Sequence, residues 1–393
     1  MRILATVFFT LLFLYVTCQN TAVIRGNVLD SETGLPIISA NIVIEGKGMG
    51  TTTDVDGFFS ISDLDSGTQK IIITYLGYDT LTANIDLKPN QIYFNNFTLS
   101  ESSIQLGTVN ISAARQTART EVQVSTVNIS AQEIRQLPSI GGESDIAQYL
   151  QLVPGIITTG DQGGQVFIRG GSPIQNKILL DGLTIYNPFH SIGFFSVFET
   201  DLIQNVDVYT GGFSAEYGGR ISAIVDIKTR DGNRKKISGQ LAANPFLYKA
   251  YIEGPIIKYR DGGGSTSFVF TSKNSIIDRT ADILYEHAAF DDSIGLPFQF
   301  SDVYGKLSFA NQNGSKLNLF GFNYIDRVNF QNIANLDWNS NGGGVNFTLI
   351  PSGSNLTVDG VVSFSNYEIS LLEADDNPRS SSIGGFNAAL NFT

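Results

Sequence analysis

Apolar and polar residues alternate with period two over two parts of the chain, and this period predicts β-strands. Between residues 23 and 99 the alternating runs are short, and turn residues separate them at the spacing of a small β-sandwich. From residue 237 onward alternation returns in longer runs. Examples are residues 23–28, 40–45, 70–75, 303–310, 345–350 and 386–393. The chain is therefore predicted to be mainly β.

The residues between 121 and 231 follow a different pattern. Asp145 or Ser144 can cap a helix that Pro154 and Gly155 end, and short strands flank it. This mixture predicts an α+β unit. Paired glycines at 170–171, 211–212 and 218–219 permit tight turns with close backbone approach.

The N-terminus resembles a secretory signal. Met1 and Arg2 precede an apolar run over 3–16, which is shorter than the roughly 20 residues of a spanning helix. We predict a signal peptide over 1–18. Cys18 could be lipidated, but Thr17 stands where a lipidation signal has a small residue, which favours cleavage after Cys18. The mature chain would then contain no cysteine, which excludes disulfides and Cys-ligated metals.

Composition excludes some partners. The 393 residues suffice for two or three domains, and they carry 37 acidic against 25 basic side chains, for a net charge of -12. Because phosphates require a clustered cationic surface and the sequence has no long basic run, we expect no nucleic-acid partner. Only 16% of the residues are charged and 40 are glycine, as in glycine-punctuated β structure.

Enzyme chemistry has little support. The two histidines, His190 and His287, are far apart and outside any zinc-protease motif, and no Gly-x-Ser-x-Gly sequence occurs. Acid pairs at 291–292 and 375–376 lie in polar, turn-rich stretches. The Asp-Val-Asp-Gly run at 54–57 lacks the later Glu of a calcium loop and favours a hairpin turn. We expect no enzyme activity, no cofactor and no metal site.

The N-terminal strands resemble a known family. The matching runs are IRGNVLD (24–30), TGLPI (33–37), ANI (40–42), GTTTD (50–54), GFFSI (57–61) and TYLGY (74–78). They resemble the carboxypeptidase-regulatory-like domain. This resemblance implies a prealbumin-like sandwich over 22–99 without catalytic residues, often found in front of TonB-dependent outer-membrane receptors of the Bacteroidetes type.

The region 121–231 resembles the plug of those receptors in its full motif order. The runs are VNISAQEI (127–134), DIAQYLQLVPGI (145–156), VFIRGG (166–171), ILLDGLTIY (178–186), IQNVDVYTGG (203–212) and EYGGRISAIVDIKT (216–229). After such a plug, alternating strands over 237–393 are expected to belong to a transmembrane antiparallel β-barrel. At roughly 10 residues per strand they supply about eight strands, whereas a plugged lumen takes about 22. We expect an incomplete, C-terminally truncated barrel.

The linker over 100–120 precedes the plug, where the family carries its TonB box. Candidate box residues are Thr108, Val109, Asn110, Ile111 and Ser112. An exposed extended segment can add as a strand to the sheet of another protein. An ordinary linker strand is the alternative.

Plug loops supply the candidate substrate contacts. Asp161 and Gln162 lie in a glycine-containing loop, and Tyr186, Phe189 and His190 lie in an aromatic one. The alternative for the aromatic loop is packing of the plug against the barrel. Arg169 and Arg220 are candidates for plug–barrel contacts, with hydrogen bonds to the plug's own turns as the alternative.

The resemblance implies a receptor in the outer membrane, in contact with its lipid. The N-terminal domain and plug would lie on the periplasmic side, and the TonB–ExbB–ExbD complex would open the plug to import an extracellular small substrate, siderophore-like or other. A SusC-type glycan importer is an alternative, although residues 178–186 depart from the usual form of that branch. A secreted or surface β-rich adhesion protein and an accessory of a processing peptidase are two further hypotheses.

Overall fold

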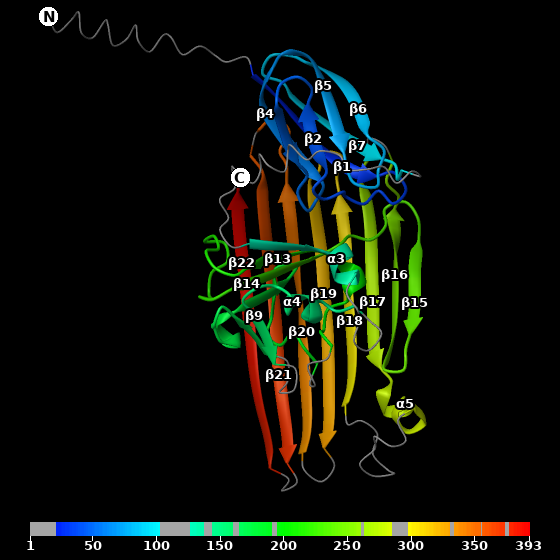
Figure 1. Ribbon diagram of the computed structural model, residues 1–393, viewed down its shortest axis with the longest axis vertical. Helices are drawn as coiled ribbons and strands as arrows, with labels where there is room; N and C mark the ends of the chain where they lie inside the picture. Colours follow the sequence, from blue (N-terminus) through cyan, green and yellow to red (C-terminus); the bar gives the residue numbers. More distant parts are fainter. Residues whose placement is uncertain are drawn as a thin grey trace, which may run out of the picture. The chain divides into compact units, whose positions relative to one another are not determined.

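The computed structural model describes residues 21–102, 126–136, 144–159, 165–190, 195–260, 263–284, 298–330, 334–354, 356–373 and 377–393 (Figure 1). The predicted signal peptide, the TonB-box candidates at 108–112, and Asp161 and Gln162 lie outside the described residues. The chain divides into two compact units, Met1–Val28 with Ile37–Thr117, and Leu29–Pro36 with Ala118–Thr393.

The first unit is a β-sandwich. One sheet has the strand order β4-β1-β7 and the other β3-β2-β5-β6. Ile24 and Phe59 from the first sheet and Ile42 and Ile71 from the second are fully buried in a shared core, because alternation turns every second side chain inward. The strands are β1 (Thr21–Asp30), β2 (Asn41–Ile44), β3 (Met49–Thr52), β4 (Phe58–Asp65), β5 (Gly67–Thr74), β6 (Leu81–Leu87) and β7 (Ile92–Leu99). The predicted sandwich is confirmed.

The run at 54–57 forms the turn that leads into β4. The Asp54 carboxylate accepts hydrogen bonds from the backbone N–H groups of Asp56 and Phe58, both at 2.9 Å. Gly57 has a positive φ of 70°, which glycine adopts without steric cost. This geometry is that of an Asx turn, which supports the turn interpretation.

The second unit contains an α+β domain built on a five-stranded sheet of order β12-β11-β14-β13-β8, with a separate β9–β10 hairpin. In it, β11 and β14 are parallel and β13 is antiparallel to β14. Its elements are β8 (Thr126–Ser130), α3 (Ala131–Arg135), α4 (Ile146–Leu150), β9 (Ile156–Thr159), β10 (Gln165–Ile168), η4 (Pro173–Gln175), β11 (Lys177–Leu180), β12 (Leu183–Ile185), η5 (Thr200–Leu202), β13 (Ile203–Tyr209) and β14 (Ile224–Thr229).

Local signals define its helix starts. Ser130 and Glu133 form a reciprocal capping box at α3. Asp145 caps α4, as predicted, by accepting the Ala147 N–H at 2.7 Å. The helix ends at Leu150, earlier than expected, and turns continue to Gly155. Among the described residues, no helix is both long and apolar enough to cross a membrane.

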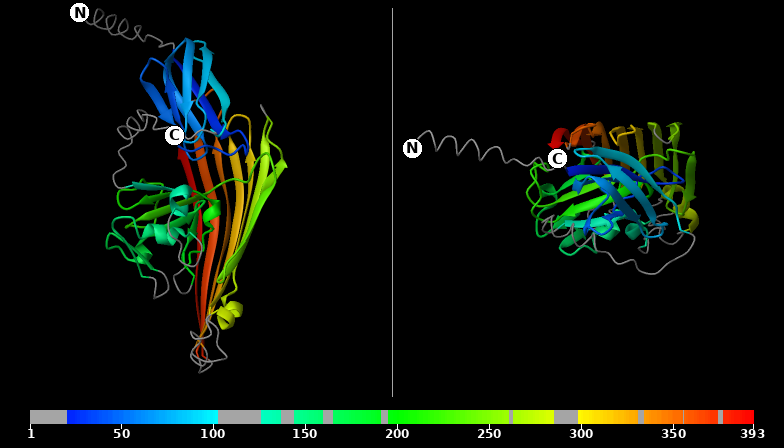
Figure 2. Two further views of the ribbon diagram at one scale, coloured as in Figure 1. Left: turned by 45° about the vertical axis from the view of Figure 1, so that its right-hand side comes forward. Right: turned by 90° about the horizontal axis from the view of Figure 1, so that it is seen from above.

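The remaining strands form one eight-stranded sheet in sequence order from β15 to β22. Every neighbouring pair is antiparallel. The α+β domain lies against one face of this sheet (Figure 2). The strands are β15 (Ser238–Ala243), β16 (Leu247–Ile257), β17 (Ser265–Ser275), β18 (Phe298–Ala310), β19 (Lys316–Phe330), β20 (Ala334–Leu349), β21 (Val358–Glu373) and β22 (Pro378–Phe392), with helix α5 (Ile277–Leu284) after β17. Within the described residues β15 and β22 do not pair, so the sheet is open, as expected of an incomplete barrel.

The two faces of the sheet differ in polarity. On β18 most of the buried side chains toward the α+β domain are polar, among them Asp302, Lys306 and Ser308, while Leu307 and Phe309 are each 37% exposed on the other face. This confirms the predicted alternation. The face toward the α+β domain is called the wall below.

Several strands are longer than the ten residues expected, reaching 16 in β20 and β21. The side chains on the face away from the α+β domain account for this additional strand length. On this face Leu319, Val345 and Val362 form an apolar row across three strands. A polar row, formed by Asn323, Asn341 and Asn366, lies further along the same strands. An apolar band shorter than the strands is what a bilayer-spanning sheet that projects into water requires.

Candidate functional site

Four lysines project from neighbouring strands of the wall toward the α+β domain. They are Lys249 on β16, Lys273 on β17, Lys306 on β18 and Lys316 on β19, and the last three are at most 8% exposed. Each meets a carboxylate or carbonyl oxygen supplied by residues 196–201 or 229–231. Since buried charges require partners, these lysines place the α+β domain on the wall.

The β16 and β17 lysines hold the segment around η5. Lys249 Nζ lies 2.8 Å from both Glu199 Oε1 and Asp201 Oδ2. Lys273 Nζ donates to the backbone carbonyls of Ser196 at 2.9 Å and Phe198 at 3.2 Å. This segment therefore contacts the wall through both side-chain and backbone oxygens.

A second cluster, called the Asp231 contact, lies just after β14. Asp231 is completely buried, and its carboxylate accepts from Ser308 Oγ and Arg234 Nη2, both at 2.9 Å. Lys316 Nζ is 3.0 Å and Lys306 Nζ 3.4 Å from it. Burial by itself would raise the pKa of Asp231, but Lys316, Lys306 and Arg234 outweigh it and hold this pKa well below its usual range.

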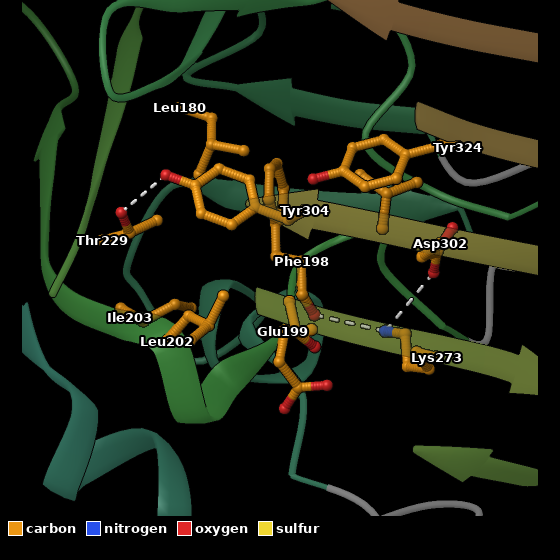
Figure 3. A pocket seen from close by; sticks show the side chains of 12 residues that line it. Leu180, Phe198, Glu199, Leu202, Ile203, Thr229, Lys273, Asp302, Tyr304 and Tyr324 are labelled. Atoms are coloured by element: carbon orange, nitrogen blue, oxygen red, sulfur yellow. Dashed lines mark hydrogen bonds and ion pairs between the residues drawn. The ribbon is translucent and has the colours of Figure 1, made fainter. Parts of the chain in front are cut away.

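The β11–β12 turn extends this cluster. Asp181 and Gly182 have positive φ values of 52° and 90°, as a two-residue Asp-Gly hairpin requires. The Asp181 carboxylate accepts from Thr229 Oγ1 at 2.6 Å and from the Tyr304 hydroxyl at 2.5 Å. Thr229 and Tyr304 are joined in Figure 3. Lys306 completes the group, at 3.8 Å from Asp181 Oδ1.

The hairpin tip reaches three further strands. The Gly182 carbonyl accepts from Ser363 Oγ on β21 at 3.0 Å and from Asn387 Nδ2 on β22 at 3.1 Å. Asn346 Nδ2 on β20 donates to the Asp181 carbonyl at 3.3 Å. A Cβ at residue 182 would lie 2.6 Å from Val361 Cγ2, so glycine is required for this close approach.

A third cluster, called the His190 contact, joins the loop after β12 to β18 and β19. His190 is 1% exposed. Its Nε2 lies 2.9 Å from Asp302 Oδ2 and its Nδ1 3.3 Å from Asp326 Oδ2. The imidazole stacks on Phe300 with ring centroids 3.9 Å apart. Burial would lower the pKa of His190, but the two carboxylates outweigh it and raise this pKa to about 9.

A small cavity of about 20 Å³ lies between the segment around η5 and the wall (Figure 3). Lys273, Asp302, Tyr304 and Tyr324 line it from the wall, and Phe198 and Glu199 line it from the α+β domain. Asp302 Oδ1 is buried there without a hydrogen-bond partner. A cavity of this size has room for one water molecule but not for a substrate.

The described residues contain no group of three or more His, Cys, Asp or Glu side chains that could hold a metal ion. At His190 the reason is visible, because each ring nitrogen faces a different carboxylate and the three groups do not converge on one point. The interface supports docking by charge and hydrogen bonding.

The aromatic substrate candidates lie at the interface. Phe189 is 4% and His190 1% exposed, and both are covered by protein in this state. Tyr186 lies beside β22, since its hydroxyl is the first atom that a Cβ at Gly385 would meet. This placement favours the packing alternative, and substrate contact by these residues stays a prediction.

The two arginine candidates have contacts within the α+β domain. Arg220 Nη1 donates to the Gly219 carbonyl at 2.8 Å. The Arg169 backbone N–H donates to the Gly155 carbonyl at 2.7 Å, and its guanidinium packs against Gly211. The turns beside these arginines lead into the first residues of β11 and β14, whereas Asp181 and Thr229 lie at the other ends of these strands. Contact of the arginines with a barrel stays a prediction.

The main residues of the interface were not predicted from the sequence. Asp181, Asp231, Asp302, Asp326 and the four lysines were not singled out. One signal was present, since Asp302 and Lys306 occupy the polar positions of an alternating strand, which would face the lumen of a barrel.

Two family models match the chain. The CarboxypepD_reg-like domain matches residues 24–111. The TonB-dependent receptor plug domain matches residues 117–224, which include most of the α+β domain described above.

The chain carries the plug domain of the TonB-dependent receptors.

Curated relatives support this assignment. TonB-dependent receptor SusC of Bacteroides thetaiotaomicron is 26% identical over 219 residues, covering 53% of this chain and 21% of the relative. TonB-dependent receptor P3 of Formosa agariphila is 25% identical over 237 residues, covering 58% of this chain and 22% of the relative. The chain thus spans about one fifth of the length of the curated relatives it matches.

Solved structures also align with the chain. The FrpB iron transporter from Neisseria meningitidis aligns with a TM-score of 0.49 at 14% identity, covering 69% of this chain and 46% of that one. The copper transporter OprC aligns with a TM-score of 0.47 at 13% identity, covering 68% of this chain and 43% of that one.

Proposed function

We propose that this chain is part of a TonB-dependent outer-membrane transporter that binds an extracellular small nutrient and imports it when TonB opens the plug. The observation that carries the proposal is a plug domain docked by buried charges on the polar face of a sheet whose other face is apolar. No catalytic step is part of this function.

The sheet supports a place in the outer membrane. Lipid cannot satisfy the backbone groups of an open sheet edge, so the proposed transporter includes further strands that close the barrel around the plug. The outward apolar residues would then contact lipid. Arg169 and Arg220, at the plug end away from Asp181 and Thr229, would contact the closing strands.

Energy coupling would use the segment ahead of the plug. Residues 108–112 would pair with TonB by strand addition, and TonB with ExbB and ExbD would pull the plug from the wall. The N-terminal sandwich and the plug would lie on the periplasmic side.

The substrate is proposed as siderophore-like or another small nutrient, with Asp161, Gln162, Tyr186, Phe189 and His190 as candidate contacts once the plug moves. A second candidate is a SusC-type glycan importer, and the similarity to TonB-dependent receptor SusC supports it. Growth of a deletion strain under iron limitation and on polysaccharides as carbon source separates the two.

Membrane fractionation of cells expressing the full chain tests the location. We expect the chain in the outer-membrane fraction, with an electrophoretic mobility that changes on heating. Recovery in the soluble fraction or the medium would contradict the proposal and favour a secreted adhesion protein.

A peptide of residues 100–120 tests the coupling step with the periplasmic domain of TonB. We expect binding by the native peptide and loss of binding on Val109→Pro, because proline removes a strand hydrogen bond. Ala113→Pro, outside the candidate box, is the matched control. Equal binding by all three peptides, or by none, would overturn the assignment of the box.

A further inference from the structure

The His190 contact places an imidazole between two carboxylates, which favours the protonated histidine. Asp302 and Asp326 contribute two negative charges, and Lys273, 3.8 Å from Asp302 Oδ2, contributes one positive charge. His190 is buried between the two carboxylates and stacks on Phe300. An imidazolium can donate to both carboxylates, whereas a neutral imidazole has a single N–H and can donate to only one of them.

Further groups face this cluster. The phenol of Tyr324 on β19 lies near Asp302, and that of Tyr367 on β21 lies near Asp326. On the plug side, Asp145 Oδ2 accepts the Ser196 N–H at 2.6 Å, so this carboxylate is engaged within the plug. Among the charged groups described at the interface, His190 is the one whose ordinary pKa lies near neutral pH.

We propose that His190, as an imidazolium, is the positioning residue that fixes the plug loop at 187–190 to β18 and β19, and that loss of its proton releases this contact. This inference deepens the proposed function and rests on the assignment of the plug. The Asp231 contact, in which a carboxylate meets lysine and arginine side chains and which adjoins the connection into β15, would stay in place.

The wall contains a native reporter of this contact. Trp338 is the only tryptophan of the sequence, and it packs against the cluster that contains Phe195 and Phe300. Release of His190 from Phe300 would change the surroundings of this indole. Tryptophan emission therefore follows the His190 contact without an added label.

The experiment measures the urea midpoint of the Trp338 emission change between pH 5.5 and 10 for the full chain in detergent. The pKa of His190 is raised, so its contribution is complete below the ordinary value near 6.5 and is lost as pH rises through about 9. We expect the midpoint to fall as pH rises from about 6.5 to about 9. This fall should correspond to an equilibrium constant for docking of the loop that decreases about tenfold per pH unit, in total on the order of 100-fold.

Two variants make the test specific. His190→Gln removes the charge, so its midpoint should be low and independent of pH. His190→Arg keeps a permanent, planar cation that can stack on Phe300 and donate to both carboxylates, so its midpoint should remain high at pH 10. The same tyrosines and lysines are present in all three proteins.

A decline with pH in His190→Arg that equals that of the native chain would overturn the proposal, as would a native midpoint that does not change with pH. If His190→Gln fails to fold, the comparison of the native chain with His190→Arg decides. The measurement uses neither TonB nor a substrate. The role of His190 can therefore be disproved while the proposed transport function stands, and the transport function can be disproved while the role of His190 stands.

Discussion

The Asp231 and His190 contacts hold the same domain to the same wall but differ in their chemistry. Asp231 is surrounded by the cationic side chains of Lys306, Lys316 and Arg234. His190 instead supplies the cation itself, to Asp302 and Asp326. Both sites are buried, so burial does not distinguish them.

The difference shows how one interface can combine a permanent and a conditional attachment. A carboxylate among lysines loses its charge only in acid, whereas an imidazolium among carboxylates loses its charge in mild alkali. The permanent contact adjoins the chain connection into β15, where separation of the plug from the barrel is limited. The conditional contact lies on the loop after β12, which does not lead directly into a strand of the wall.

The largest effect should come from Asp231→Asn. This change leaves three buried cations without their carboxylate, and we expect it to lower the free energy of unfolding of the second unit by about 3–5 kcal/mol. Urea unfolding of the full chain measures the loss. Asp337→Asn, in an exposed pair with Arg327, is the control and should change stability by less than about 0.5 kcal/mol. Equal effects of the two changes would contradict the special role of Asp231.

The same pair of proteins gives a pH dependence. Because the pKa of Asp231 is lowered in the folded state, its contribution is present above the unfolded value near 4 and is lost as pH falls through the folded value. The stability gap between native chain and Asp231→Asn should therefore be constant from pH 7 to 5 and shrink below about pH 4. A gap that shrinks between pH 7 and 5 would show that another group is responsible.

Lys273→Met should have the next largest effect, about 3 kcal/mol. Methionine preserves most of the volume but leaves the carbonyls of Ser196 and Phe198 without their donor. The loss should appear in the Trp338 transition more than in the unfolding of the sandwich. Lys70→Met, in an exposed pair with Glu45, is the matched control. An unchanged Trp338 transition would mean that Lys273 does not help to dock the segment around η5.

Gly182→Ala tests the hairpin tip between the two contacts, with an expected loss of about 2 kcal/mol. Part of the loss comes from the positive φ of 90° and part from the clash with Val361. The double variant Gly182→Ala/Val361→Ala should relieve only the steric part, which a double-mutant cycle measures. Strict additivity of the two changes would argue against this close approach.

Ser363→Ala should have the smallest effect, about 1 kcal/mol, since it removes one of two side-chain donors to the Gly182 carbonyl. Exposed Ser380→Ala is the control and should be neutral. A loss as large as that of Asp231→Asn would place the main attachment at the hairpin tip.

Local sequence patterns were sufficient to assign the faces of the strands and the local turns. Period-two alternation assigned Leu307 and Phe309 to one face of β18 and Lys306 and Ser308 to the other, because successive side chains of a strand point in opposite directions. The Asp145 cap could also be read locally, because it depends on neighbours within a few residues. The plug was recognised from motif order.

The pairing of the buried charges, in contrast, depends on how distant elements pack. His190 and Asp302 are 112 residues apart, and their contact depends on how the plug is placed against the wall. The register between β18 and β19 then places Asp302 and Asp326 on opposite sides of one imidazole. Periodicity reports the burial of a residue but not its distant partner, since that partner is set by packing between elements. For this reason the sequence indicated only that His190 lies in a loop. The fold places its imidazole between Asp302 on β18 and Asp326 on β19.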